Sequence, residues 1–152
     1  MIGSATRLVL FTACAVLAGC SGGDAPDPEA EIRTWINEMQ EYAEAKERRS
    51  IIANISENYA DWLGNGRNDV EDILRIYFLR QNSIALLTSI DEIRLLGDSA
   101  AEVSLTVGMA GTQDGGLGFS ADAYDFELEL ERDDEEWRLI SAKWGAVGSQ
   151  LY

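Results

Sequence analysis

The sequence contains no histidine among its 152 residues. That absence excludes Ser-His-Asp and Cys-His catalytic sites, and it removes most ligand sets that bind zinc. Cysteine is nearly as scarce, since Cys14 and Cys20 are the two that the chain has. The glycine-rich stretch GTQDGGLG at 111–118 lies between two expected strands. It offers no helix N-terminus to hold a phosphate, so we do not expect a nucleotide site there.

Basic residues are also few. The chain has 12 Lys and Arg against 27 Asp and Glu, a formal net charge of −15. No basic patch offsets this charge, so nucleic acid is excluded as a partner, and anionic lipid should repel the domain within about 8 Å. The acidic stretches DGG and DDEE lack the alternating ligand spacing of a calcium loop. We therefore expect no metal and no cofactor.

The longest apolar run, LVLFTACAVLA at 8–18, is too short for a membrane-spanning helix, which needs about 20 residues. It follows a single charge, Arg7, and has the length of a signal-peptide core. The motif LAGC that ends at Cys20 resembles the lipobox of bacterial lipoproteins. The resemblance implies cleavage before Cys20, a diacylglycerol on its sulfur and a further acyl chain on its amine. The alternative is an ordinary secretory signal that happens to contain a cysteine.

This resemblance divides the chain into a signal peptide (1–19), the lipidated cysteine with a flexible tether (20–27) and a folded domain (28–148). The seven residues 21–27 should reach about 15 Å, which keeps the domain close to the membrane. Ser21 follows the cysteine in place of the aspartate associated with inner-membrane retention in enteric bacteria. We therefore expect a lipid-anchored protein on the periplasmic face of the outer membrane, without a disulfide.

Three helices are expected in the first half of the folded domain. Asp27 suits an N-cap, Pro28 suits the first helical position, and apolar residues recur at spacings of three and four over 32–43. Ser50 is the expected cap of a second, short helix, although one long helix is an alternative. Asn68 is the expected cap of the third.

Four strands are expected from residue 83 onward, because the apolar period changes there from about 3.6 to 2. The alternation slips by one residue near Asp91–Glu92, which predicts a β-bulge. The last strand, 137–144, has apolar residues on both faces and is expected inside the sheet. Helices followed by strands with short connections indicate an α+β fold, with the helices on a curved antiparallel sheet of about four strands.

This order resembles the cone-shaped, cystatin-like fold of the nuclear transport factor 2-like superfamily, and in particular its small proteobacterial lipoproteins of unassigned activity. The stretches that carry the resemblance are DILRIYFLRQNSIALLTSI (72–90), VSLTVGMAG (103–111), DAYDFELEL (122–130) and EWRLISAKW (136–144). Enzymes of the superfamily, such as ketosteroid isomerase, use an Asp or Glu inside the cone. No motif around those residues matches this chain, so none of their catalytic residues is carried over.

Carboxylates and aromatic residues are the remaining candidates for a site. Asp61, beside Tyr59 and Trp62, is a candidate general base; its alternative role is to hold the loop GNGRND. Asp125 should point away from the core. Arg80 is a candidate anion contact or a partner for the helix dipole. Six residues either line a ligand pocket or belong to the core: Trp35, Tyr42, Tyr77, Met109, Tyr124 and Trp144.

Three functions follow from these patterns. The scarcity of catalytic groups favours a membrane-anchored, non-enzymatic module that holds a small apolar ligand in the cone or presents its sheet to a periplasmic protein. The second is a small isomerase, cyclase or dehydratase that uses a buried carboxylate. The third is a structural envelope lipoprotein. The sequence leaves the oligomeric state open, a dimer included.

Overall fold

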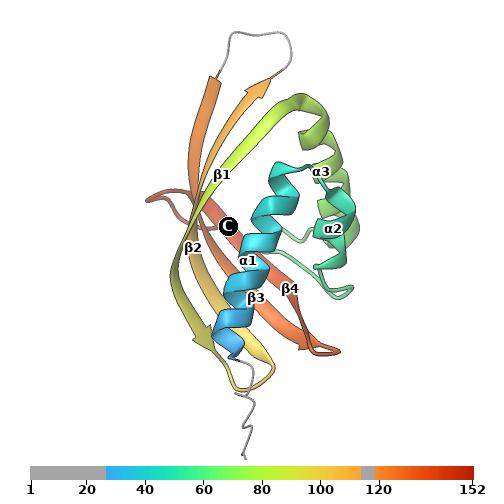
Figure 1. The fold of residues 1–152 in the computed structure, drawn as a ribbon, viewed down its shortest axis with the longest axis vertical. Coiled ribbons are helices and arrows are strands. Elements are labelled where there is room, and N and C mark those ends of the chain that lie inside the picture. Colours follow the sequence, from blue (N-terminus) through green and yellow to red (C-terminus); the bar gives the residue numbers. More distant parts are fainter. Residues whose placement is uncertain (1–26, 114–118) are drawn as a thin grey trace, which may run out of the picture.

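The structure is a computed structural model that describes residues 27–113 and 119–152. The expected signal peptide, Cys20 and all of the tether except Asp27 lie outside the described residues. Three helices precede four long strands (Figure 1). The elements are α1 (Pro28–Glu44), α2 (Arg48–Ala53), α3 (Arg67–Arg80), β1 (Gln81–Leu95), β2 (Ala100–Gln113), β3 (Phe119–Asp133) and β4 (Glu136–Ala146). No helix in the described ranges is long and apolar enough to cross a membrane.

The start of the first helix is as expected, and the next two starts are not. The Asp27 carboxylate accepts a hydrogen bond from the Glu29 amide at 3.1 Å, as an N-cap should. The second helix begins at Arg48, and Ser50 lies inside it, where its hydroxyl donates to Glu47 at 3.0 Å. The third begins at Arg67, so Asn68 is not its cap. In α3 the Asp69 carboxylate accepts a hydrogen bond from the Gly66 amide at 2.8 Å, whereas no side chain of the described residues caps α2.

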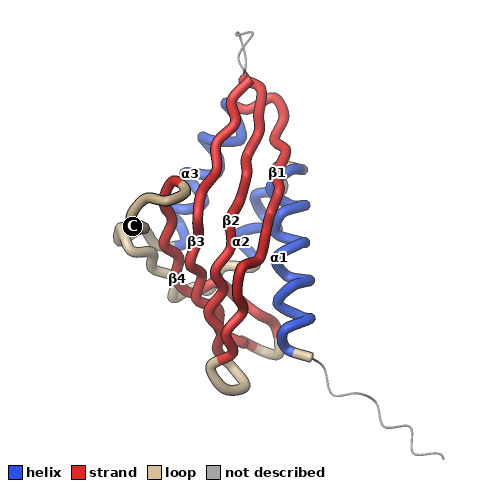
Figure 2. The backbone as a smooth tube through the Cα atoms, turned by 90° about the vertical axis from the view of Figure 1, so that its left-hand side faces the viewer, coloured by secondary structure: helices blue, strands red, loops and turns tan. Residues whose placement is uncertain are grey.

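The four strands form one antiparallel sheet in the order β1-β2-β3-β4. Its register shifts between Ile90 and Glu92, which confirms the predicted bulge. The sheet curves around the helices, with α1 against its concave face (Figures 1 and 2). The α+β fold class expected from the sequence is therefore confirmed.

The position of the last strand differs from the expectation, because β4 is an edge strand of the sheet. Ile140 is an extra residue there: Leu139 pairs with Leu130, while Ser141 pairs with Glu129. This bulge reverses the alternation, so the apolar residues on both sides of it turn to the same concave face. The segment after α2 covers part of the outer edge, since the Ala60 amide donates to the Ile140 carbonyl at 3.1 Å.

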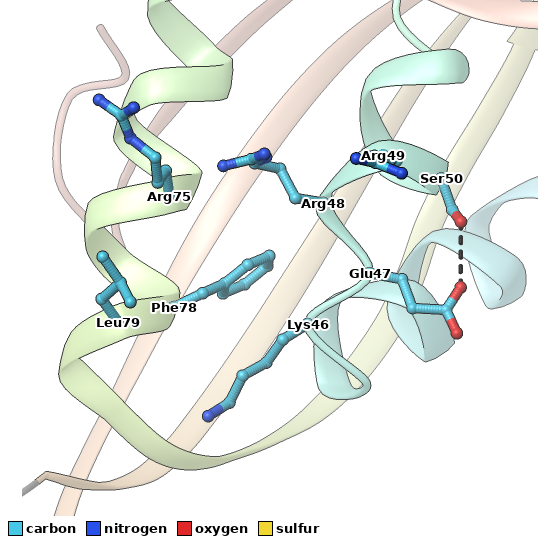
Figure 3. A pocket seen from close by; sticks show the side chains of 8 residues that line it. All are labelled: Lys46, Glu47, Arg48, Arg49, Ser50, Arg75, Phe78 and Leu79. Carbon is cyan, nitrogen blue, oxygen red and sulfur yellow. Dashed lines mark hydrogen bonds between the residues drawn. The ribbon is translucent and has the colours of Figure 1, made fainter.

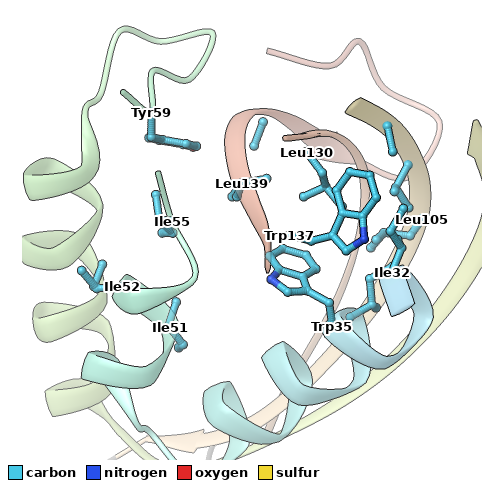
Figure 4. Packing of buried hydrophobic residues seen from close by; sticks show 14 residues of the cluster. Ile32, Trp35, Ile51, Ile52, Ile55, Tyr59, Leu105, Leu130, Trp137 and Leu139 are labelled. Carbon is cyan, nitrogen blue, oxygen red and sulfur yellow. The ribbon is translucent and has the colours of Figure 1, made fainter. Parts of the chain in front are cut away.

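The hydrophobic core lies between α1, α2 and the half of the sheet that is nearer the start of α1 (Figure 4). Its most deeply buried large side chains are Ile32, Ile55, Val103 and Leu130, each under 2% exposed. Trp137 belongs to this cluster, and its indole N–H donates to Glu31 at 3.1 Å. The other half of the cone, toward the C-terminal end of α1, is less tightly filled.

Candidate functional site

A cavity of about 250 Å³ lies between α1 and the concave face of the sheet. α1 contributes residues at spacings of one turn, and β1, β2 and β3 contribute every second residue, because those positions face inward. The lining residues are Trp35, Ile36, Met39, Gln40, Leu86, Thr88, Leu105, Val107, Met109, Phe126, Leu128 and Leu139.

The chemistry of this lining is almost wholly apolar. Its polar groups are the side chains of Gln40 and Thr88 and the indole N–H of Trp35, which has no hydrogen-bond partner among the described residues, and none of the lining residues is charged. The Gln40 amide nitrogen already donates to the Leu86 carbonyl oxygen at 3.3 Å. A cavity of this kind binds through apolar contact and offers only a few hydrogen bonds for orientation.

The structure places two of the six proposed pocket residues in this cavity, Trp35 and Met109. Tyr42 lines a separate cleft between α1, the end of α2 and the start of β4, and Trp144 packs against the core. The sequence analysis missed several lining residues, among them Met39, Phe126 and Leu128. The signal was present, because Phe126 and Leu128 share the alternation phase of Tyr124.

Tyr77 and Tyr124 gather beyond the cavity with a residue that the sequence analysis missed, Asp122. Asp122 pairs with Met109 across the β2–β3 ladder, and Tyr124 pairs with Val107, so both lie on the concave side of the sheet. Asp122 is exposed there, and Tyr124 is half-buried. Burial raises the pKa of Tyr77, and the charges of Tyr124 and Asp122 raise it further. The three groups are therefore within electrostatic reach of one another. Asp122 could have been found from the sequence, because residues 122, 124 and 126 are two apart and lie on the same side of a strand.

Asp61 is buried but lies outside this cavity. Its carboxylate accepts hydrogen bonds from the Leu63 amide at 2.9 Å, the Asn65 amide at 2.8 Å and the Asn65 side chain at 2.8 Å. Three donors from its own loop occupy the carboxylate, which is the geometry of a loop-stabilising residue. Burial, and then the charge of Asp61, raises the pKa of the neighbouring Tyr59.

The other charged candidates lie on the outside of the molecule. Asp125 faces away from the core, where it accepts hydrogen bonds from the Thr106 hydroxyl at 3.0 Å and the Gly148 amide at 3.3 Å. Arg80 is exposed in the last turn of α3. In residues 27–113 and 119–152, no three acidic or cysteine side chains lie close enough together to hold a metal ion.

Comparison with known proteins gives a fold but no family. No family model matches the chain, and no curated protein matches its sequence. A candidate scytalone dehydratase from Novosphingobium aromaticivorans superposes with a TM-score of 0.73 at 12% identity, over 82% of this chain and 87% of that one. A ketosteroid isomerase-like protein from Erwinia carotovora atroseptica gives 0.65 at 12% identity, over 79% and 96%.

A hexachlorocyclohexane dehydrochlorinase from Novosphingobium barchaimii also superposes on the chain, with a TM-score of 0.67 at 11% identity, over 82% of this chain and 89% of that one. These neighbours share the nuclear transport factor 2-like fold, as the sequence patterns predicted. At such identities the likeness concerns the fold, since one fold hosts many unrelated activities.

Proposed function

We propose that this protein is a lipid-anchored envelope module that binds a small apolar ligand in its cone without catalysing a reaction. The observation that carries the proposal is the lining of the cavity, which has twelve residues and no charged group among them. General acid–base chemistry needs a titratable group within hydrogen-bond reach of the substrate. The lining offers none, whereas apolar contact is available on every side.

The anchoring half of the proposal rests on the sequence around Cys20, and it locates the domain at the periplasmic face of the outer membrane. The first described helix starts at Pro28, eight residues after the cysteine. The cone is thus held near a lipid phase, where apolar compounds concentrate. A membrane-proximal cavity with an apolar lining suits a ligand that partitions between lipid and water.

The volume of the cavity limits the size of its ligand. Cavities of about 150 Å³ lined by aliphatic and aromatic side chains accept benzene, and sites for drug-sized ligands begin at about 300 Å³. At about 250 Å³, this cavity suits a monocyclic, bicyclic or short aliphatic compound. A polar group at one end of the ligand would contact Gln40 or Thr88.

Filling the cavity should abolish ligand binding. Val107 lines it, and Val107→Phe would place a ring in the space without displacing the surrounding core. We expect the affinity for the bicyclic apolar probe 1-aminonaphthalene, followed by its fluorescence, to fall at least about tenfold, a loss of ~1.4 kcal/mol. The melting temperature should be unchanged or raised, because a filled cavity restores dispersion contacts.

The control is Val147→Phe, the same substitution at a position that is 55% exposed. Both variants are made in the chain from residue 20 with Cys20→Ala, which retains every described element and needs no detergent. Val147→Phe should bind the probe like its parent. Equal binding by Val107→Phe and its parent would contradict a ligand site in the cone.

A second candidate function is proton abstraction by Asp122. The observation in its favour is the group of Asp122, Tyr124 and Tyr77 beside the cavity, since a carboxylate and a phenol can remove a proton and steady an enolate. The fold neighbours named as a ketosteroid isomerase-like protein and a hexachlorocyclohexane dehydrochlorinase support this candidate.

Asp122→Asn should then abolish deuterium exchange at the α-carbon of small enolisable ketones, as measured by proton NMR in deuterium oxide. The same variant should lower the pKa of Tyr77, because it removes one of the charges that raise it. Asp125→Asn, three residues along β3 on the convex face, is the matched control and should change neither. Absence of exchange by the unaltered chain would leave ligand binding as the function.

A further inference from the structure

The charge of this acidic protein is unevenly distributed over its surface. Of its 12 basic residues, six lie between positions 46 and 80, in α2, α3 and the turns before them: Lys46, Arg48, Arg49, Arg67, Arg75 and Arg80. The same segment has six acidic residues and is neutral, so the net charge of −15 belongs to the rest of the chain. The α2–α3 side is therefore the part of the domain that an anionic surface repels least.

A groove of about 470 Å³ between the start of α2 and the C-terminal half of α3 gathers four of these cations (Figure 3). Its lining residues are Lys46, Glu47, Arg48, Arg49, Ser50, Arg75, Phe78 and Leu79. In Figure 3, Arg48 reaches from α2 toward α3, which carries Arg75, Phe78 and Leu79. The groove thus combines positive charge with an apolar floor.

Some of these cations already have partners inside the protein. The Arg48 Nε lies 3.3 Å from Glu71, Arg75 lies 3.1 Å from Asp72, and the Lys46 Nζ donates to the Asn82 carbonyl at 2.9 Å. Arg49 and Arg80 have no acidic partner within 4.0 Å in the described part of the chain. Their full charges are available to a ligand or surface outside the domain.

Beside the groove, α3 presents a row of exposed apolar side chains. Ile73, Ile76 and Leu79 recur every three residues and are 53%, 47% and 76% exposed. None of the residues of α3 is buried, although Val70, Leu74 and Phe78 pack against the core from its inner side. Apolar side chains flanked by arginine on one helix are typical of a helix that lies in a membrane interface.

We infer that this side of α3 rests on an anionic phospholipid surface. The docking face consists of Ile73, Ile76, Leu79, Arg49, Arg75 and Arg80. It also carries one exposed carboxylate, Asp72, which pairs with Arg75, so Arg49 and Arg80 supply its net positive charge. The inference rests on the proposed lipid anchor, which brings the domain to the membrane. Anionic headgroups complement the arginines, and the three apolar side chains enter the boundary between headgroups and acyl chains. The acidic remainder of the domain, including Glu127 and Glu129 on the convex sheet face, then points away from the lipid.

The tether is long enough for this orientation. α1 lies between the sheet and the pair α2 and α3 (Figure 1), and packed helices are about 8–10 Å apart. α1 packs against α2 and α2 against α3, so the start of α1 is up to two helix layers, or about 20 Å, farther from the lipid than α3. Seven residues can span about 25 Å when extended, so the segment 21–27 allows α3 to reach the surface.

The test compares two equally exposed leucines on opposite sides of the domain. Leu79→Cys on α3 and Leu87→Cys on the convex face of β1 replace side chains that are 76% and 77% exposed. Each variant of the full, lipidated chain is labelled with a nitrobenzoxadiazole dye and reconstituted in phosphatidylglycerol vesicles or phosphatidylcholine vesicles. On phosphatidylglycerol, emission from position 79 should shift to shorter wavelength and be quenched by brominated acyl chains. Emission from position 87 should not change.

Charge reversal supplies the second arm of the test. Arg49→Glu combined with Arg80→Glu should return the emission of the dye at position 79 toward its value in water, as should phosphatidylcholine or high salt. A dye at position 79 that stays in water on phosphatidylglycerol vesicles overturns the inference. A blue shift without vesicles, accompanied by a doubled mass, also overturns it and assigns the face to a second copy. Failure of the chain with intact Cys20 to stay on any vesicle contradicts the lipid anchor instead.

Discussion

Cys20→Ala should move nearly all of the protein from the membrane fraction to the soluble fraction. Each buried methylene of an acyl chain contributes about 0.8 kcal/mol, so two or three chains hold a protein on the membrane almost irreversibly. The docking face of α3 adds a weaker and reversible contact, which would not retain the domain by itself. The measurements are cell fractionation and the intact mass of the protein, which should lose the mass of the lipid.

Cys14→Ala is the matched control, because it makes the same substitution six residues earlier in the chain. By the lipobox resemblance Cys14 leaves with the signal peptide, so this variant should remain membrane-bound and lipidated. A Cys20→Ala protein that still carries the lipid mass, or that still sediments with membranes, would refute the proposed anchor. The proposed location at the outer membrane would then also be unsupported.

Trp137→Ala should be among the most destabilising single substitutions, at a cost of roughly 3–5 kcal/mol in the free energy of unfolding. The side chain is 4% exposed and fills the core beside α1. Its indole N–H donates to Glu31 at 3.1 Å, and the Arg132 guanidinium carbon lies 4.9 Å from its ring centroid. The variant loses this burial and also removes one contact each from Glu31 and Arg132, which pair with each other.

Trp62→Ala provides the comparison for the same chemical change. Trp62 is 65% exposed, and the Lys143 Nζ lies 5.1 Å from its ring centroid. We expect a cost below about 1 kcal/mol from this substitution. Urea unfolding followed by circular dichroism measures both values. Similar costs for the two variants would mean that Trp137 does not anchor the core.

The two halves of the cone differ in how completely side chains fill them. The half around Trp137 and Leu130 is filled and supplies stability. The half around Met109 and Val107 keeps an unfilled cavity, which costs stability because its walls lack contact partners. Such a loss of stability is expected where the cavity binds a ligand. The proposed ligand would restore those contacts on binding.

Much of the architecture was readable from local patterns. The pair Asp27 and Pro28 marked the first helix start, because capping depends on residues within one turn. The change of apolar period after residue 83 separated helices from strands. The bulge near Asp91 was visible as a slip in the alternation of one strand. Each of these features depends on residues that are close together in the chain, so the sequence alone determined it.

Other features depended on which segments meet in space. The extra residue Ile140 made the last strand look apolar on both faces. It can be identified as a bulge only from the pairing of its neighbours with Glu129 and Leu130 in β3. Asp122 became a candidate only when the β2–β3 register placed it opposite Met109. The three donors that Asp61 meets likewise come from its own loop, whose geometry no spacing rule predicts.

The distribution of charge shows most clearly what the sequence determined and what the tertiary structure decided. Composition determined that the chain is acidic, and on that basis anionic lipid should repel it. The tertiary structure placed Arg49 from one helix on the same groove as Arg75 and Leu79 from another, and left the excess of carboxylates elsewhere. Coulomb interactions act over distances in space, so the face that a charged protein turns toward a membrane is decided by its fold and not by its net charge.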